Sequence, residues 1–257
     1  MSDLLNNIKN LREMTGAGFL DCKKSLEESG NDLDNAVDFL RKKGLAKANK
    51  KSSREAKEGA IGIFSNSNIT SILQINTETD FAAKNEIFLN FMDEIGNYSL
   101  ENNDINLSID EFNKISYNGI TIGDHFKNII AKIGENIILT KLIKIKKTEN
   151  EFLSSYIHNS YRKNVGKIGV ILKFKAQDIN ENVNKLGKNM CMHIAASKPL
   201  SLNIDQLDKK LIEKETEVQL ESIKSSGKPE NIIEKILEGK MNKFYSESTL
   251  LNQQYIL

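Results

Sequence analysis

The sequence of 257 residues has no tryptophan, two prolines, two cysteines and three histidines. Because Cys22 and Cys191 lie far apart, neither a disulfide scaffold nor a zinc ribbon is expected. No apolar run approaches the roughly 18 residues that a membrane-spanning helix needs. Residues 1–13 mix acidic and basic side chains, unlike a signal or transit peptide, so we expect a cytoplasmic protein without membrane attachment.

An excess of charge of one sign is also missing, because 36 Lys and Arg oppose 35 Asp and Glu. Only four of the basic residues are arginine, the side chain best suited to bidentate contacts with phosphates and bases. Direct nucleic-acid binding is therefore not expected. The remaining composition, 39% hydrophobic and 28% charged, is typical of a globular protein with one large domain or about two or three small ones.

The common motifs for phosphate binding, dinucleotide binding and zinc proteolysis are absent: GxxxxGK[ST], GxGxxG and HExxH. The histidines are more than 30 residues apart: His125, His158 and His193. Cys191 and His193 form a C-x-H pair, but side chains two positions apart on a helix point in different directions. Cys22 beside Lys23 is either a reactive thiol or a small core residue. The sequence predicts no enzyme active site, no metal site and no cofactor.

Residues 1–50 are predicted to form a bundle of three helices, followed by a linker over 51–58. Hydrophobic residues recur at helical spacing in each helix: Leu4, Leu5, Ile8, Leu11, Leu20, Leu26, Leu33, Ala36, Val37 and Leu40. Glycines at 16, 18 and 30 interrupt the pattern between the helices. The polar stretch 44–58 is either a solvated linker helix or a basic surface that contacts a partner.

Residues 59–147 are predicted to form a first α/β subdomain. Its expected elements are strands over 59–64 and 69–76, a helix over 81–97, a loop with a short helix over 98–124, a helix over 126–133 and a strand over 137–145. The two strands form a hairpin around residues 65–68. Ile69, Leu73 and Ile75 are expected on one face of the second strand.

Residues 148–200 repeat the order strand, strand, helix. The expected elements are strands over 152–158 and 167–174, a long turn over 159–166, and a helix over 183–194 with Val183, Leu186, Met190 and Ile194 on its buried face. Residues 201–250 predict an antiparallel hairpin of helices over 205–224 and 229–245, joined at 226–229, with Leu207, Leu211 and Val218 on one side. The predicted fold class is α+β.

Five segments carry a close resemblance to one family: LREMTGAGFLDCKKSLEESG at 11–30, TETDFAAKN at 77–85, KIGENI at 132–137, MHIAASKP at 192–199 and GKPENIIEKILEGKMNKFY at 227–245. They resemble translation elongation factor Ts, the guanine-nucleotide exchange factor for elongation factor Tu. The resemblance implies a bundle like a ubiquitin-associated (UBA) domain, two core subdomains with antiparallel strands and a helical hairpin of the dimerisation type. Residues 98–124 are longer than in some members. Many members also continue beyond the equivalent of Leu257, so the second subdomain is expected to be incomplete.

The resemblance also implies roles for individual residues. Asp80 and Phe81 match the pair inserted near the partner's magnesium and nucleotide, and three more match contacts with the same domain: Ile133, Gly134 and His158. Arg12, Phe19 and Lys23 lie in the segment that docks on that domain. The implied partner is elongation factor Tu, GDP-bound or nucleotide-free, and a homodimer or a 2:2 complex is compatible with the hairpin.

Each of these residues has a simpler reading from spacing alone. Phe81 would be the first core residue of its helix, and Asp80 would be its N-cap. His158 would be a structural histidine at a strand end, and Ile133 with Gly134 a turn between a helix and a strand. Two other functions also stay open: a binding module that does not accelerate exchange, and a small-molecule enzyme that uses His158.

Overall fold

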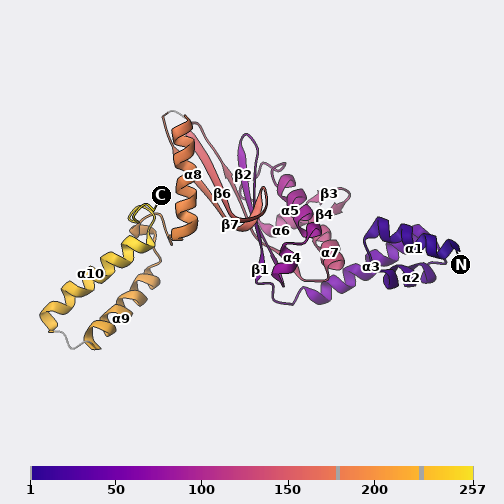
Figure 1. Ribbon diagram of the computed structural model, residues 1–257, viewed down its shortest axis with the longest axis horizontal. Coiled ribbons are helices and arrows are strands. Elements are labelled where there is room, and N and C mark those ends of the chain that lie inside the picture. The colour runs from indigo at the N-terminus through magenta and orange to yellow at the C-terminus, as the bar shows by residue number, and fades with distance from the viewer. Residues whose placement is uncertain (1, 178–179, 226–228, 257) are drawn as a thin grey trace. The chain divides into compact units, whose positions relative to one another are not determined.

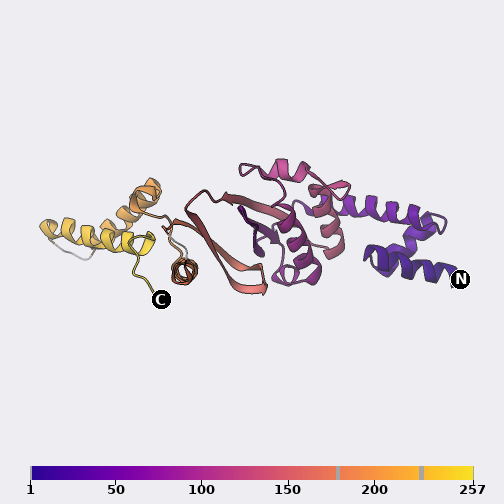
Figure 2. The same cartoon turned by 90° about the horizontal axis from the view of Figure 1, so that it is seen from above.

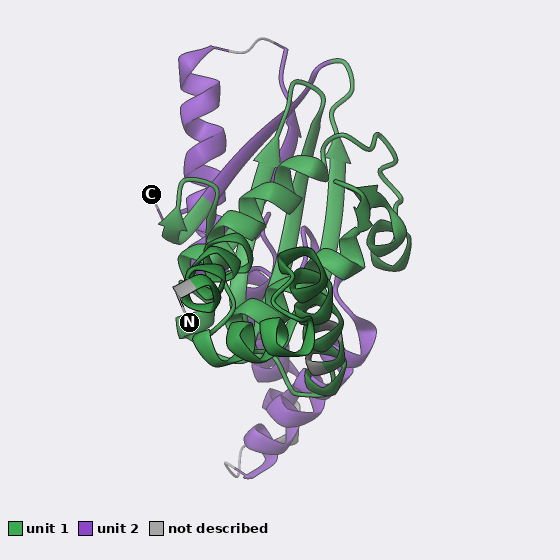
Figure 3. Cartoon of the chain, turned by 90° about the vertical axis from the view of Figure 1, so that its right-hand side faces the viewer, with its two compact units in different colours: residues 1–149, 157–169 green, residues 150–156, 170–257 purple. Residues whose placement is uncertain are grey.

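The computed structural model describes residues 2–177, 180–225 and 229–256 (Figure 1). The chain divides into two compact units, residues 1–149 with 157–169 and residues 150–156 with 170–257 (Figure 3). Helices are combined with antiparallel strand pairs, which confirms the α+β class. The predicted domain boundaries are a finer division than these two units and stay predictions. No helix among the described residues is long and apolar enough to span a membrane.

The N-terminal part of unit 1 is a bundle of α1 (Ser2–Thr15), α2 (Phe19–Glu28) and α3 (Leu33–Lys51). A small core joins the three helices: Ile8, Leu11, Cys22, Leu26 and Ala36. Cys22 is fully buried, and burial raises the pKa of its thiol, so it is a core residue and not a reactive nucleophile.

Helix α3 extends beyond the bundle and packs on α7 (Ile122–Ile133). A Cβ atom on Gly44 would lie 3.0 Å from the Cβ atom of Ala131, and Ala48 belongs to the large core of unit 1. The reading of 44–58 as a solvated linker helix is therefore right only in part: most of its described side chains are exposed or half-buried, but Gly44 and Ala48 are packed. Its first half is a packed helix, and the helix ends at Lys51.

The large core of unit 1 lies on a five-stranded sheet in the order β5-β2-β1-β7-β6. The predicted hairpin is present as β1 (Glu58–Ser65) and β2 (Ile69–Thr77), and β2 also pairs with β5 (Ile137–Lys146). Ile69, Leu73 and Ile75 are buried together as expected. Helix α5 (Glu86–Tyr98) packs on this sheet through its apolar face: Phe88, Phe91, Met92 and Ile95.

Two predictions in unit 1 are wrong at helix ends. The helix expected over 81–97 is two helices, α4 (Asp80–Ala83) and α5, because the Asn85 side chain accepts the Ile87 N–H and begins a new helix. The segment 98–124 contains α6 (Ile109–Lys114), β3 (Ser116–Tyr117) and β4 (Ile120–Thr121). Helix α7 begins at Ile122, earlier than expected, because Thr121 caps the Asp124 N–H.

The long turn expected over 159–166 is also wrong. Strand β6 (Glu151–Arg162) and strand β7 (Val165–Lys175) continue through it and leave a turn only at Lys163 and Asn164. Val165 is fully buried and Tyr161 packs on the large core, so tertiary contacts hold this polar segment in strand conformation. Both strands contribute residues to both units.

Unit 2 contains α8 (Glu181–Ser197), whose buried face differs from the predicted one. Leu186 is 56% exposed, whereas Gly187, Cys191 and Ala195 are buried. A Cβ atom on Gly187 would lie 2.2 Å from the Ser154 hydroxyl oxygen. The close approach of the helix to β6 at this glycine turns Leu186 outward.

The rest of unit 2 is the predicted helical hairpin. A short 3-10 turn (Ile204–Gln206) precedes α9 (Lys209–Ser225), which therefore starts later than expected, and α10 (Glu230–Ser248) follows. The two helices run side by side in antiparallel directions (Figures 1 and 2). Ile223 and Met241 are buried, but Val218 is 51% exposed, so it does not share a buried side with Leu207. Residues 226–228 of the predicted junction lie outside the described residues.

Candidate functional site

Phe81 is the second residue of the short helix α4, in the segment from the end of β2 to the end of α4, which we call the Phe81 turn (residues 77–83). Its side chain is 82% exposed, the largest fraction among the exposed large hydrophobic residues that the structure describes. The two alanines that follow, Ala82 and Ala83, are buried instead. The reading of Phe81 as a core residue is therefore wrong. The exposed phenyl ring is available for contact with another molecule.

Asp80 is not the N-cap of α4. That position is held by Thr79, whose hydroxyl oxygen accepts the Ala82 N–H at 3.2 Å. The Asp80 carboxylate instead accepts a hydrogen bond from Lys84 at 2.8 Å. This bond holds the pKa of Asp80 below its ordinary value and raises that of Lys84. The residue before Phe81 is therefore an ionised carboxylate that is paired with Lys84.

Ile133 and Gly134 end α7. Gly134 has a φ of 89°, a left-handed conformation that favours glycine, and it is the C-cap residue of the helix. Ile133 is half-buried against the large core. The carbonyl oxygen of Gly134 also accepts a hydrogen bond from Lys51 at the end of α3. The turn expected from spacing alone is thus present.

The next two residues, Glu135 and Asn136, connect this turn to the Phe81 turn. The Glu135 carboxylate accepts the Thr79 N–H at 2.9 Å and the Thr79 hydroxyl at 2.7 Å. In the opposite direction, the Glu78 carboxylate accepts the Asn136 N–H at 2.6 Å. Two of the sequence motifs, TETD and GEN, are therefore bonded to each other.

His158 lies within β6 and is exposed, so its predicted place at the end of a strand is wrong. The same strand approaches α4 three residues later, where the Lys84 ammonium lies 5.8 Å from the centre of the Tyr161 ring. The residue that follows α4 therefore contacts the strand that carries His158. Among the other histidines, His125 bonds the Tyr117 carbonyl oxygen, as His193 bonds Gln253.

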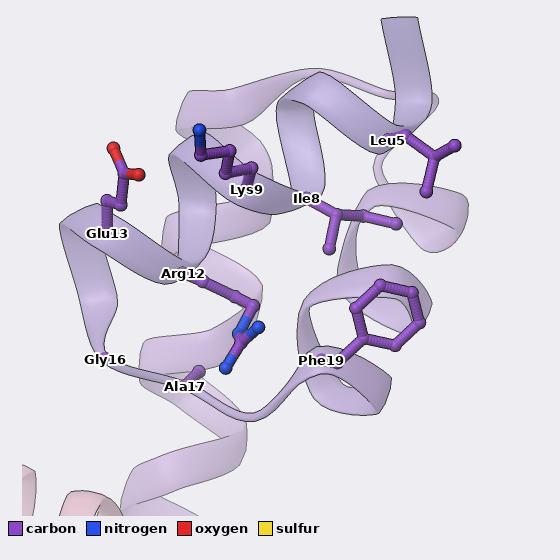
Figure 4. A pocket seen from close by; sticks show the side chains of 8 residues that line it. All are labelled: Leu5, Ile8, Lys9, Arg12, Glu13, Gly16, Ala17 and Phe19. Atoms are coloured by element: carbon purple, nitrogen blue, oxygen red, sulfur yellow. The ribbon is translucent and has the colours of Figure 1, made fainter. Parts of the chain in front are cut away.

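The predicted docking residues lie on the N-terminal bundle. Arg12 and Phe19 line a groove of about 440 Å³ between α1 and α2, together with Leu5, Ile8, Lys9, Glu13, Gly16 and Ala17. Figure 4 shows the Arg12 side chain extending along this groove towards Phe19. Lys23 is not among the lining residues, and its ammonium lies 3.7 Å from Glu27. The structure therefore brings two of the three together.

Within the described parts of the chain, no group of three His, Cys, Asp or Glu side chains could hold a metal ion. Cys191, the remaining candidate, is fully buried on α8, and burial raises the pKa of its thiol to about 11. Its thiol is therefore neutral at ordinary pH and poorly suited to ligate a metal. The candidate site consists of an aromatic ring, a carboxylate and their supports, which suits binding.

Comparison with known proteins places these motifs in a family. A family model described as "Elongation factor TS" matches residues 78–257. Elongation factor Ts of Allorhizobium ampelinum is 40% identical over 252 residues, covering 97% of this chain and 80% of the relative. The chain belongs to the elongation factor Ts family. The protein of that name in Sinorhizobium fredii is 40% identical, over 97% of this chain and 81% of the relative. The one in Gluconobacter oxydans is 39% identical, over 97% of this chain and 82% of the relative.

Membership of the elongation factor Ts family confirms the resemblance and makes the protein a factor of translation elongation. The hydrogen bonds of the structure add four residues that were not singled out from the sequence: Glu78, Thr79, Glu135 and Asn136. All four lie inside the motifs TETDFAAKN and KIGENI. Only their spacing of 56 to 58 residues along the chain concealed that they are bonded pairs.

Proposed function

We propose that this elongation factor Ts chain promotes GDP release from elongation factor Tu, with Phe81 as the main exchange contact. The observation that carries the proposal is the 82% exposure of Phe81 on a turn whose neighbours are buried or hydrogen-bonded. Covering a phenyl ring at an interface contributes roughly 2–3 kcal/mol. This free energy would stabilise a conformation of the partner that has a pocket for the ring.

The proposed reaction breaks no covalent bond, so the protein is not an enzyme in the chemical sense and needs no cofactor. If the factor weakens nucleotide binding by some ratio, nucleotide must weaken factor binding by the same ratio. A thousandfold weakening corresponds to about 4 kcal/mol of differential contact. Contacts formed only with the nucleotide-free conformation supply that difference. We propose that the protein binds elongation factor Tu both with GDP bound and without nucleotide. We also propose that it is cytoplasmic.

The other site residues have supporting roles in this proposal. The Asp80 carboxylate adds negative charge next to Phe81, where it would compete with phosphate oxygens for the partner's metal ion. Ile133, Gly134 and His158 make additional contacts with the same domain. The bundle, which we propose is UBA-like, docks on that domain through Arg12, Phe19 and Lys23. A homodimer or a 2:2 complex through the helical hairpin belongs to the same proposal.

The experiment is release of a fluorescent GDP analogue from elongation factor Tu, measured at saturating concentrations of each variant. Phe81→Ala should slow release at least about tenfold, because about 1.4 kcal/mol of lost contact corresponds to a factor of ten. Its thermal midpoint should stay near that of the wild type, since the ring is exposed. Ile143→Ala is the matched control, because Ile143 is 50% exposed on β5 in the same unit and has no assigned role.

Two other outcomes would point to the alternatives. Binding of elongation factor Tu without faster release would support a binding module that uses the groove beside Arg12 and Phe19. If Phe81→Ala is less stable but fully active per folded molecule, the ring has no role in nucleotide release.

A further inference from the structure

Two glutamates are bonded across the junction between the Phe81 turn and the end of α7. Glu135 accepts both the N–H and the hydroxyl hydrogen of Thr79, and Glu78 accepts the N–H of Asn136. We call these contacts the crossed pairs. Carboxylates that accept backbone N–H groups make stronger and more directional bonds than neutral acceptors. The crossed pairs therefore restrict both backbones at once.

Thr79 has no free hydrogen-bonding group left after these contacts. Its N–H and hydroxyl hydrogen go to Glu135, its hydroxyl oxygen caps the Ala82 N–H, and its carbonyl oxygen accepts the Thr77 hydroxyl at 2.7 Å. Phe81 is two residues further along the chain. A turn bonded in this way has few backbone conformations, so the backbone position from which the Phe81 ring projects is restricted.

The crossed pairs extend to the end of helix α3. Asn136 is only 4% exposed, and its side-chain amide donates to the Arg54 carbonyl oxygen at 2.7 Å. The Arg54 guanidinium in turn lies 3.5 Å from Glu78. The segment that leaves the bundle is therefore bonded to the same junction that supports Phe81.

We propose that Glu135, Glu78 and Asn136 are positioning residues that hold Phe81 in the orientation needed for nucleotide release. The inference rests on the proposed role of Phe81 and adds the reason why the ring is effective. A contact that is preorganised loses less conformational entropy when the partner covers it. Glu135 and Asn136 thus act through Phe81 and need no contact with nucleotide.

Glu135→Ala is the test variant and Glu111→Ala its matched control. Glu111 makes the same kind of pair in α6, where its carboxylate accepts the Ser108 N–H at 2.9 Å and the Ser108 hydroxyl at 2.6 Å. We expect Glu135→Ala to slow maximal GDP release about fivefold. Glu111→Ala should lose comparable stability but keep the wild-type release rate per folded molecule.

A double-mutant cycle with Phe81→Ala separates positioning from general destabilisation. If Glu135 acts through the ring, Glu135→Ala should have almost no further effect on maximal release when Phe81 is already alanine. Amide hydrogen exchange supplies a second measurement, because the Thr79 and Asn136 N–H groups should exchange faster in Glu135→Ala and Glu78→Ala, respectively. Glu135→Gln keeps one acceptor oxygen and should be intermediate, and it replaces the alanine variant if that one does not fold.

The possible results are distinguishable. If Phe81→Ala releases GDP like the wild type, the proposed function itself fails. If Phe81→Ala is slow but Glu135→Ala is as fast as Glu111→Ala, only the positioning role fails. Equal fold reductions by Glu135→Ala in both backgrounds would also overturn it, since they would show an effect independent of the ring.

Discussion

At the scale of single residues, Cys191 illustrates how burial changes the chemistry of a side chain. It is fully buried on α8, and burial raises the pKa of its thiol from about 9.0 to about 11. The folded protein therefore holds the thiol proton at pH values where an unfolded chain has already released it. The stabilisation is complete below pH 9 and is lost as the pH rises through about 11.

This shift predicts an alkaline loss of stability. The free energy of unfolding should fall by about 2–3 kcal/mol between pH 9 and pH 11 because of Cys191 alone. Cys191→Ala should be less stable at pH 7, since it leaves a cavity, but its free energy should fall less steeply over the same interval. Urea denaturation of both proteins at several pH values measures the two slopes. Equal slopes would mean that Cys191 does not titrate in this range.

At the scale of secondary-structure elements, Arg162 connects the end of β6 to one face of α5. Its guanidinium donates to Asp93 at 2.7 Å and to Asn90 at 2.8 Å, and it also bonds Glu86. The three partners are three or four positions apart, so they lie on one side of the helix. The two carboxylates, Asp93 first and then Glu86, raise the pKa of Arg162. They hold the polar end of β6 in place against α5.

Arg162→Ala should destabilise the protein, because three partners on α5 lose the guanidinium that they bond. Thermal unfolding measures this as a fall of a few degrees in the midpoint. Arg162→Lys should recover only part of the loss, because an ammonium group cannot reproduce the planar fork of the guanidinium. Lys163→Ala, one residue away in the turn, serves as the control and should change stability by less than about 0.5 kcal/mol.

At the scale of the whole molecule, the proposed contacts divide between two functions. The groove on the bundle is lined by Arg12 and Phe19, whereas Phe81 and its supports follow the end of the inner strand β2. Phe19 is 43% exposed, and Lys23 is an exposed residue paired with Glu27. Rim contacts of this kind change affinity more than they change the reaction of the bound complex.

The double variant Arg12→Ala/Phe19→Ala should therefore raise the factor concentration needed for half-maximal GDP release by about tenfold, which corresponds to about 1.4 kcal/mol. The maximal rate at saturation should stay within about twofold of the wild type. Titration of each variant against a fixed amount of GDP-loaded elongation factor Tu yields both quantities. A lower maximal rate with unchanged half-saturation would assign the groove to the exchange step instead.

Much of the fold followed from the sequence, because it depends on neighbours along the chain. Alternating side chains predicted the hairpin of β1 and β2, with Ile69, Leu73 and Ile75 buried as expected. Helical spacing predicted the bundle and both helices of the hairpin in unit 2. The motif around Phe81 also identified the turn, although spacing alone favoured a core residue there.

The tertiary structure alone decided features that depend on residues far apart in sequence. Ser154 on β6 approaches α8 at Gly187, which moved the buried face away from Leu186. The polar end of β6 is a strand because its neighbours in space hold it there. Likewise, Glu135 bonds Thr79 across 56 residues, so no local pattern could reveal the pair. Local sequence determined where elements begin and which side is apolar, whereas close packing and long-range hydrogen bonds determined which side chains meet.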